Sequence, residues 1–194
     1  DLVLTKKELR TQLLDKRKAI TLKDWENRSK RIHRHILKSE IYQKSETIHI
    51  YLSMNDRKEV DTIDLINRML EDRKTIVVPV TDFKTTTLRH SELQSLTDLE
   101  TNKWGVKEPA KLKEISTDQL DLVLVPLLGA DKKGNRLGYG KGFYDRFLEM
   151  NSSPSFGLIF DEFITDFIPT EIHDVPLDGL ISESGLIYCN KGYQ

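Results

Sequence analysis

The sequence is poor in the features that mark secreted, membrane-spanning and nucleic-acid-binding proteins. Its single cysteine, Cys189, cannot form an internal disulfide, and one thiol does not make a zinc site by itself. No apolar run approaches the roughly 20 residues needed to cross a membrane. The formal net charge is −1 at pH 7, so the overall charge gives no reason to expect nucleic acid or a membrane as a partner. We therefore expect a soluble, cytoplasmic protein.

Linkers, repeats and low-complexity segments are also lacking, which favours a single domain over residues 1–194. Charge is unevenly distributed along the chain, because residues 1–38 hold twelve basic and five acidic side chains. Two solvated helices explain most of this excess. The alternative is that one or two of these cations bind an anion.

Hydrophobic periodicity predicts helices and strands in alternation. The predicted helices are 5–19, 21–39, 61–72 and 144–150. The predicted strands are 47–53, 75–80, 87–93, 120–128, 155–160 and a pair within 179–188. The run 120–128 is the most apolar and is expected at the centre of the sheet. This order indicates an α/β protein with a layered, partly parallel sheet.

The first predicted helix carries two cations at the end where a helix disfavours them. Thr5-Lys6-Lys7-Glu8 has the pattern of a capping box, which places Lys6 and Lys7 in the first turn. The positive end of the helix dipole lies there. These lysines therefore either point into solvent or meet an anion.

Residues 136–147, RLGYGKGFYDRF, have glycine at every second position, at Gly138, Gly140 and Gly142. A P-loop would need Ser or Thr after its lysine, whereas Lys141 is followed by glycine. A dinucleotide fingerprint needs G-x-G-x-x-G, and here the pattern is G-x-G-x-G. A kinase glycine loop would need an HRD motif downstream, which is lacking.

The chemistry of this stretch still points to a phosphate ligand. Glycines let backbone amides approach an anion, and a helix beginning near Phe143 would add its N-terminal amides. Arg136 can grip phosphate oxygens bidentately, and Lys141 adds a point charge. Asp145 is an oxygen ligand that suits magnesium. The pattern favours a triphosphate cradle with a metal ion, and the alternative is a glycine-rich turn before a solvated helix.

Residues 124–148, LVPLLGADKKGNRLGYGKGFYDRFL, resemble the signature of the 5-formyltetrahydrofolate cyclo-ligase family, also called 5,10-methenyltetrahydrofolate synthetases. Four further segments resemble the family in the same order along the chain. They are KKELR (6–10), YLSM with EVDT (51–62), WGV with EP (104–109) and HDVPLDGLISE (173–183).

The resemblance implies a three-layer α/β/α sandwich around a mixed, partly parallel sheet. It also implies a carbon–nitrogen ligase of one-carbon metabolism that converts 5-formyltetrahydrofolate to 5,10-methenyltetrahydrofolate, with ATP going to ADP and phosphate and with Mg²⁺ required. The expected partners are therefore 5-formyltetrahydrofolate and ATP, with no nucleic acid and no membrane. A monomer or weak dimer is expected.

The resemblance also assigns site residues. Catalytic roles go to Arg136, Lys141 and Tyr144, and magnesium would be held by Asp145 and Asp178. ATP would be bound by Lys6, Lys7, Glu8, Leu9, Arg10, Arg136, Leu137, Gly138, Tyr139, Gly140, Lys141, Gly142, Phe143 and Tyr144. The folate would be contacted by Leu52, Glu59, Trp104, Tyr139, Gly140, Lys141, Gly142 and Phe143.

Several alternatives stay open at this stage. The five residues 54–58 lengthen the turn before EVDT, so either Glu59 or Asp56 could meet the folate. Trp104 could stack on a flat ring or be a half-buried core residue. The protein could also be a sugar-phosphate isomerase or CoA transferase that uses no ATP, or a binder without turnover.

Overall fold

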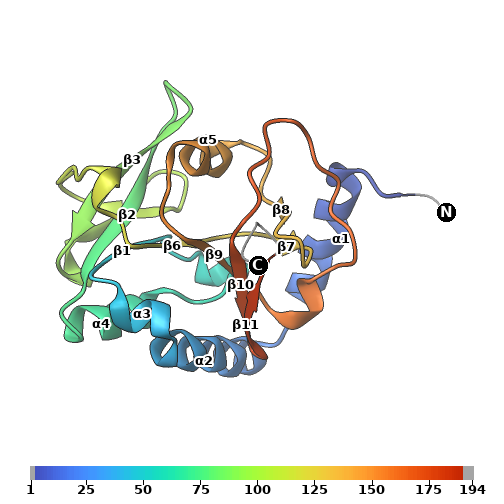
Figure 1. The fold of residues 1–194 in the computed structure, drawn as a ribbon, viewed down its shortest axis with the longest axis horizontal. Coiled ribbons are helices and arrows are strands. Elements are labelled where there is room, and N and C mark those ends of the chain that lie inside the picture. Colours follow the sequence, from blue (N-terminus) through green and yellow to red (C-terminus); the bar gives the residue numbers. More distant parts are fainter. Residues whose placement is uncertain (1–2, 190–194) are drawn as a thin grey trace.

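A computed structural model describes residues 3–189 and shows one central sheet with helices on both of its faces (Figure 1). The helices are α1 Lys6–Lys18, α2 Leu22–Lys38, α3 Glu40–Lys44, α4 Ile63–Glu71 and α5 Phe143–Met150. The strands are β1 Thr47–Ile50, β2 Thr75–Asp82, β3 Thr87–Leu93, β4 Leu99–Thr101, β5 Lys107–Pro109, β6 Leu122–Val125, β7 Gly129–Ala130, β8 Arg136–Leu137, β9 Ser155–Leu158, β10 Gly179–Ser182 and β11 Gly185–Tyr188.

The main sheet has the strand order β11-β10-β9-β6-β1-β2-β3. Its five inner strands run parallel, while β3 and β11 pair antiparallel at the two edges. Strand β6 lies in the middle, and all of its residues are buried. The predicted central strand and the predicted α/β class with a mixed sheet are thus confirmed.

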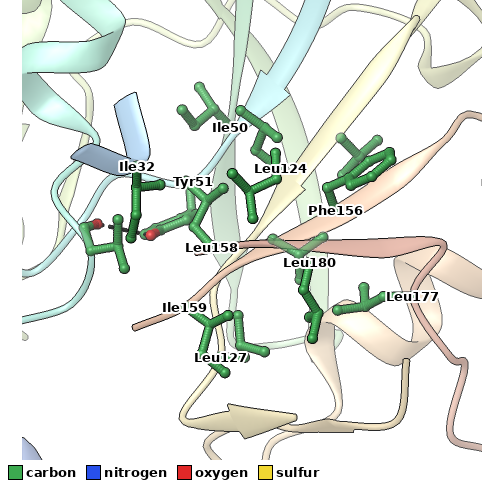
Figure 2. Close-up of a cluster of buried hydrophobic side chains, with 14 of the residues drawn as sticks. Ile32, Ile50, Tyr51, Leu124, Leu127, Phe156, Leu158, Ile159, Leu177 and Leu180 are labelled. Carbon is green, nitrogen blue, oxygen red and sulfur yellow. Dashed lines mark hydrogen bonds between the residues drawn. The ribbon is translucent and has the colours of Figure 1, made fainter. Parts of the chain in front are cut away.

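Helices pack on the sheet from both sides. Figure 1 places α2, α3 and α4 below the sheet and α5 above it. Helix α2 contacts β10 and β11, α4 contacts β2, and α5 contacts β3. Figure 2 shows apolar side chains of this core, among them Ile32 from α2, Leu124 from β6 and Phe156 from β9. Tyr51 is part of this cluster, and its hydroxyl donates to the carbonyl of Val60 at 2.8 Å.

The capping box at the start of α1 is present as predicted. Thr5 Oγ1 accepts from the Glu8 amide at 3.2 Å, and Glu8 Oε1 accepts from the Thr5 amide at 3.2 Å. The helix therefore begins where the sequence pattern placed it, and this fixes which side chains of its first turns share a face.

The structure differs from the predicted elements at several places, among them the unpredicted hairpin of β7 and β8. The short helix α3 was not predicted; Ser39 ends α2 and at once caps α3 by accepting from the Tyr42 amide. Strands β4 and β5 form a hairpin within the predicted polar loop, and three residues are too few to show periodicity. The strand predicted over residues 47–53 ends at Ile50, because only residues 47–50 pair with β2 or β6.

Among residues 3–189, no helix has both the length and the apolar character that crossing a membrane requires.

Candidate functional site: a cleft at the carboxyl ends of the strands

A cleft of about 760 Å³ opens where β1, β2 and β6 end. In open α/β sheets, ligands bind outside the carboxyl ends of parallel strands. Several groups of described residues line the cleft, among them the first turns of α1, the segment after β1, and residues 136–146 at the glycine stretch and the start of α5. Residues of β2, β3 and β5 and the segment 171–174 complete the lining. The cleft therefore collects most of the segments that carry the sequence motifs.

The glycine stretch forms the wall of the cleft between β8 and α5. Gly140 has φ 94° and Gly142 has φ 74°, a region that residues with a Cβ rarely adopt. Gly142 is the N-cap of α5 and no side chain caps this helix, so the amides of its first turn are left for a ligand. A Cβ on Gly140 would come within 3.4 Å of the Arg10 guanidinium. Glycine thus permits both the turn and the close approach of a cation.

The side chains of residues 6–10 on α1 lie on different faces of the helix. Lys6 and Arg10 are four residues apart and both line the cleft. Lys7 and Glu8 are exposed and Leu9 is buried in the core, and none of these three is among the described residues that line it. The structure therefore brings two of the five predicted residues of this helix to the site.

The cations of the cleft are only partly paired. Arg10 Nε donates to the carbonyl of Gly138 at 2.8 Å. Lys6 Nζ lies 2.5 Å from Asp174 and 3.7 Å from Glu171. Lys141 also lines the cleft. These groups surround the glycine stretch with positive charge.

Arg136 is the buried cation of the site. Its Nη1 donates to the carbonyl of Pro126 at 3.1 Å, and its Nη2 lies 3.8 Å from Asp145. Its Nε is buried and has no hydrogen-bond partner among the described residues. Burial lowers the pKa of Arg136, and Asp145 opposes that shift. An unsatisfied donor on a buried cation is the arrangement expected of an anion site without its anion.

Tyr144 lies beside this arginine, with its ring centroid 5.6 Å from the Arg136 guanidinium carbon. Its hydroxyl is buried and unpartnered within the described part of the chain. Burial raises the pKa of Tyr144 far above its usual range, although the Arg136 cation opposes this. The hydroxyl therefore stays protonated and can donate to a ligand.

Asp145 and Asp174 are the neighbouring carboxylates at this end of the cleft. The amide of Val175 donates to Asp145 Oδ1 at 3.4 Å, which holds the segment with Asp174 beside α5. Two carboxylates suit Mg²⁺, which takes its other ligands from water and phosphate. No group of three or more metal-ligating side chains occurs within residues 3–189.

Asp178 has different surroundings. Its Oδ2 accepts from the Ser155 amide at 2.9 Å, at the amino end of β9, and it is not among the described residues that line the cleft. Asp174, which lies four residues earlier in the same segment and was not among the predicted site residues, does line the cleft. A signal was present, since Asp174 follows His173 in the block that resembles the family.

Glu59 is a buried carboxylate at the other end of the cleft. Its Oε1 accepts from the Met54 amide and its Oε2 from the Tyr139 hydroxyl, each at 2.8 Å. Burial raises the pKa of Glu59, and the Met54 amide, Arg17 and Tyr139 partly oppose that shift. Of the two carboxylates that the sequence left open, Glu59 lines the cleft with Leu52, whereas Asp56 is exposed and outside the described lining.

A row of aromatic rings leads from Phe143 in the cleft to Phe83 and Trp104, neither of which is among the described residues that line the cleft. Trp104, in the β4–β5 turn, is 57% exposed, so it is not a half-buried core residue. Its ring centroid is 5.8 Å from that of Phe83, and Phe83 is 6.1 Å from Phe143, which lines the cleft. The sequence reasoning did not identify Phe83, which lies in the turn between β2 and β3.

Comparisons with known proteins show what the whole chain is similar to. Residues 3–183 match the 5-formyltetrahydrofolate cyclo-ligase family. The 5-formyltetrahydrofolate cyclo-ligase of Mus musculus is 31% identical over 92% of this chain and 93% of its own length. That of Haemophilus influenzae is 30% identical over 89% of this chain and 94% of its own. The NMR structure of Aquifex aeolicus 5,10-methenyltetrahydrofolate synthetase has the same fold, with a TM-score of 0.86 at 24% identity over 98% of this chain and 96% of that one.

Proposed function

Since this chain belongs to the 5-formyltetrahydrofolate cyclo-ligase family and is thus an ATP-dependent ligase, we propose that it converts 5-formyltetrahydrofolate to 5,10-methenyltetrahydrofolate with ATP and Mg²⁺. The observation that carries this proposal is the division of one cleft into two unlike ends. Partly paired cations and open amides occupy one end, and a hydrogen-bonded buried carboxylate occupies the other.

The cationic end fits the phosphates of ATP. The glycine stretch and the start of α5 would bind the phosphate oxygens through main-chain amides. Lys6, Arg10, Arg136 and Lys141 would neutralise their charge, and the free Nε of Arg136 would gain a partner. Asp145 and Asp174 would hold Mg²⁺, which supplies further charge neutralisation when it is bound. On this geometry Asp174 replaces Asp178 as the second magnesium ligand.

The carboxylate end fits the folate. A pterin ring presents N–H donors on one edge, and an ionised Glu59 accepts such donors. Leu52 would contact the ring, while Trp104 and Phe83 offer flat faces to the rest of the substrate. The Tyr139–Phe143 segment lies between the two ends, so it would contact both ligands.

The reaction then follows from placing the two ligands end to end. The formyl oxygen attacks the γ-phosphorus of ATP and ADP leaves. N10 attacks the activated formyl carbon and loses its proton to water, and the carbon–oxygen bond breaks with the electron pair departing on phosphate. Phosphoryl transfer of this kind needs alignment and charge neutralisation more than covalent help. Arg136, Lys141 and Tyr144 would stabilise charge on the transferred group.

One assay tests the proposal. Purified protein is mixed with 5-formyltetrahydrofolate, ATP and Mg²⁺, and the absorption of the methenyl product is followed. Product is expected only when all three are present. Product without ATP would contradict the ligase mechanism, and tight folate binding without product would indicate a binder that lacks turnover. The cytoplasmic location and the monomer or weak dimer stay predictions.

A further inference from the structure

A buried arginine that the proposed reaction does not use lies behind the folate end of the cleft. Arg17, in the last turn of α1, is only 6% exposed. Its Nη1 donates to Tyr139 Oη at 3.0 Å, and its Nη2 donates to the carbonyl of Leu127 at 3.1 Å. Its guanidinium carbon is also 5.8 Å from the centroid of the Tyr139 ring. An arginine side chain is rarely this buried unless its charged group is paired.

The bonds of Arg17 fix the direction of the next hydrogen bond. An arginine has donors only, so the Tyr139 oxygen is the acceptor in its bond with Arg17. The hydroxyl proton of Tyr139 is thereby left for Glu59 Oε2, 2.8 Å away. The Met54 amide donates to the other oxygen, Oε1. Each carboxylate oxygen has a second lone pair, so Glu59 can still accept from an incoming ligand.

We propose that Arg17 is a positioning residue, which holds the Tyr139 hydroxyl as a donor to Glu59 and so presents an ionised carboxylate to the substrate. This inference rests on the proposed function, in which Glu59 accepts from the pterin. Arg17 itself does not line the cleft among the described residues, and it acts through Tyr139. Helix α1 would then serve both ends of the cleft: Lys6 and Arg10 would face the phosphates, and Arg17 would orient the groups that face the folate.

The charge balance around Glu59 supports this role. Burial raises the pKa of Glu59, while the Arg17 cation, the Tyr139 hydroxyl and the exposed Arg57 work against the rise. The other titratable groups facing this carboxylate are two buried tyrosines, Tyr51 and Tyr144. Arg17 is thus the buried cation among the groups that face Glu59, and its removal would favour the protonated carboxyl.

The test compares Arg17→Met with Arg57→Met, which removes an exposed cation near the same carboxylate. Glu59 is titrated by carbon-13 NMR of its carboxyl group in the ligand-free protein. The affinity for 5-formyltetrahydrofolate is measured calorimetrically without ATP between about pH 5.5 and 8. We expect Arg17→Met to raise the pKa of Glu59 and to weaken folate binding about threefold or more at the acidic end of this range. The loss should shrink as the pH rises, and ATP affinity should stay within about twofold. Arg57→Met should cause the smaller shift, because solvent screens its charge.

Two more variants keep the test decisive if Arg17→Met does not fold. Tyr139→Phe removes the donor to Glu59 but keeps the ring, and it should also raise the pKa of Glu59. Arg17→Lys keeps the charge and should lie between the wild type and Arg17→Met. Unchanged Glu59 titration in both Arg17→Met and Tyr139→Phe would overturn the inference, as would an equal loss of folate and ATP affinity. A wild-type protein that binds no 5-formyltetrahydrofolate would instead contradict the proposed function, and the NMR titration would still decide whether Arg17 sets Glu59.

Discussion

The charged groups at the two ends of the cleft differ in how far their hydrogen-bonding capacity is already used. At the end formed by α1, the glycine stretch and α5, cations lie close together, and Arg136 keeps an unused donor. At the Glu59 end, both carboxylate oxygens already accept hydrogen bonds, and each donor is itself fixed by the fold. The first end keeps a buried donor for a ligand, whereas both oxygens of the carboxylate at the second end are already held by hydrogen bonds. Substitutions at the two ends should therefore affect different kinetic parameters.

The largest effect is expected at the carboxylates of the cationic end. Asp145→Asn and Asp174→Asn should each lower turnover by about 100-fold or more, because each removes a proposed magnesium ligand beside the proposed phosphate site. Asp178→Asn is the control from the same segment and should keep turnover within about threefold. Turnover at several Mg²⁺ concentrations, with circular dichroism to confirm folding, measures this. An active Asp174→Asn together with an inactive Asp178→Asn would reverse the assignment.

Glu59→Gln should produce the next largest effect, confined to the folate. It replaces a charged acceptor by a neutral amide, so KM for 5-formyltetrahydrofolate should rise about tenfold or more, while KM for ATP stays within about twofold. Because burial raises the pKa of Glu59, wild-type folate affinity should fall as the pH is lowered through that pKa. The variant should lose this pH dependence. Equal changes in both KM values would show that the two ends are not separate.

A smaller effect is expected from the cations of α1. Lys6→Met and Arg10→Met should each raise KM for ATP about tenfold, since each removes a charge that faces the phosphates. Lys7→Met is the matched control, because it removes the same charge from an exposed position of the same turn. It should leave KM for ATP within about twofold. If Lys7→Met matches Lys6→Met, the effect comes from overall charge and not from the cleft.

The smallest effect is expected at the aromatic rings of Phe83 and Trp104. Phe83→Ala and Trp104→Ala should each raise KM for 5-formyltetrahydrofolate about threefold, because each removes one exposed ring face. Steady-state kinetics with both substrates varied would measure this change. A rise in KM for ATP alone would instead place these rings against the nucleotide.

Much of the fold was predictable, because the spacing of apolar residues in a long segment indicates which of its side chains are buried. The central strand β6 and the capped start of α1 follow from apolar runs and from a local side-chain pattern. The hairpin of β4 and β5 was not predictable, because each of its two strands has only three residues, too few to show periodicity.

The site was predictable in part, for a similar reason. The glycine stretch carries its chemistry in adjacent residues, so its sequence pattern was informative. Asp174 and Arg17 depend on contacts with segments more than 100 residues away. Arg17 lies between Lys16 and Lys18 in a run of three cations, and its sequence offers no sign that it alone is buried.

The central claim is that main-chain amides of residues 138–144 bind the phosphates of ATP. It is tested most directly by nitrogen-15 NMR of the protein titrated with ATP and Mg²⁺. The account predicts saturable shifts of the amides of Gly140, Gly142 and the first turn of α5, while amides around Asp178 stay unchanged. Saturable nucleotide binding that leaves the glycine amides unshifted would contradict it.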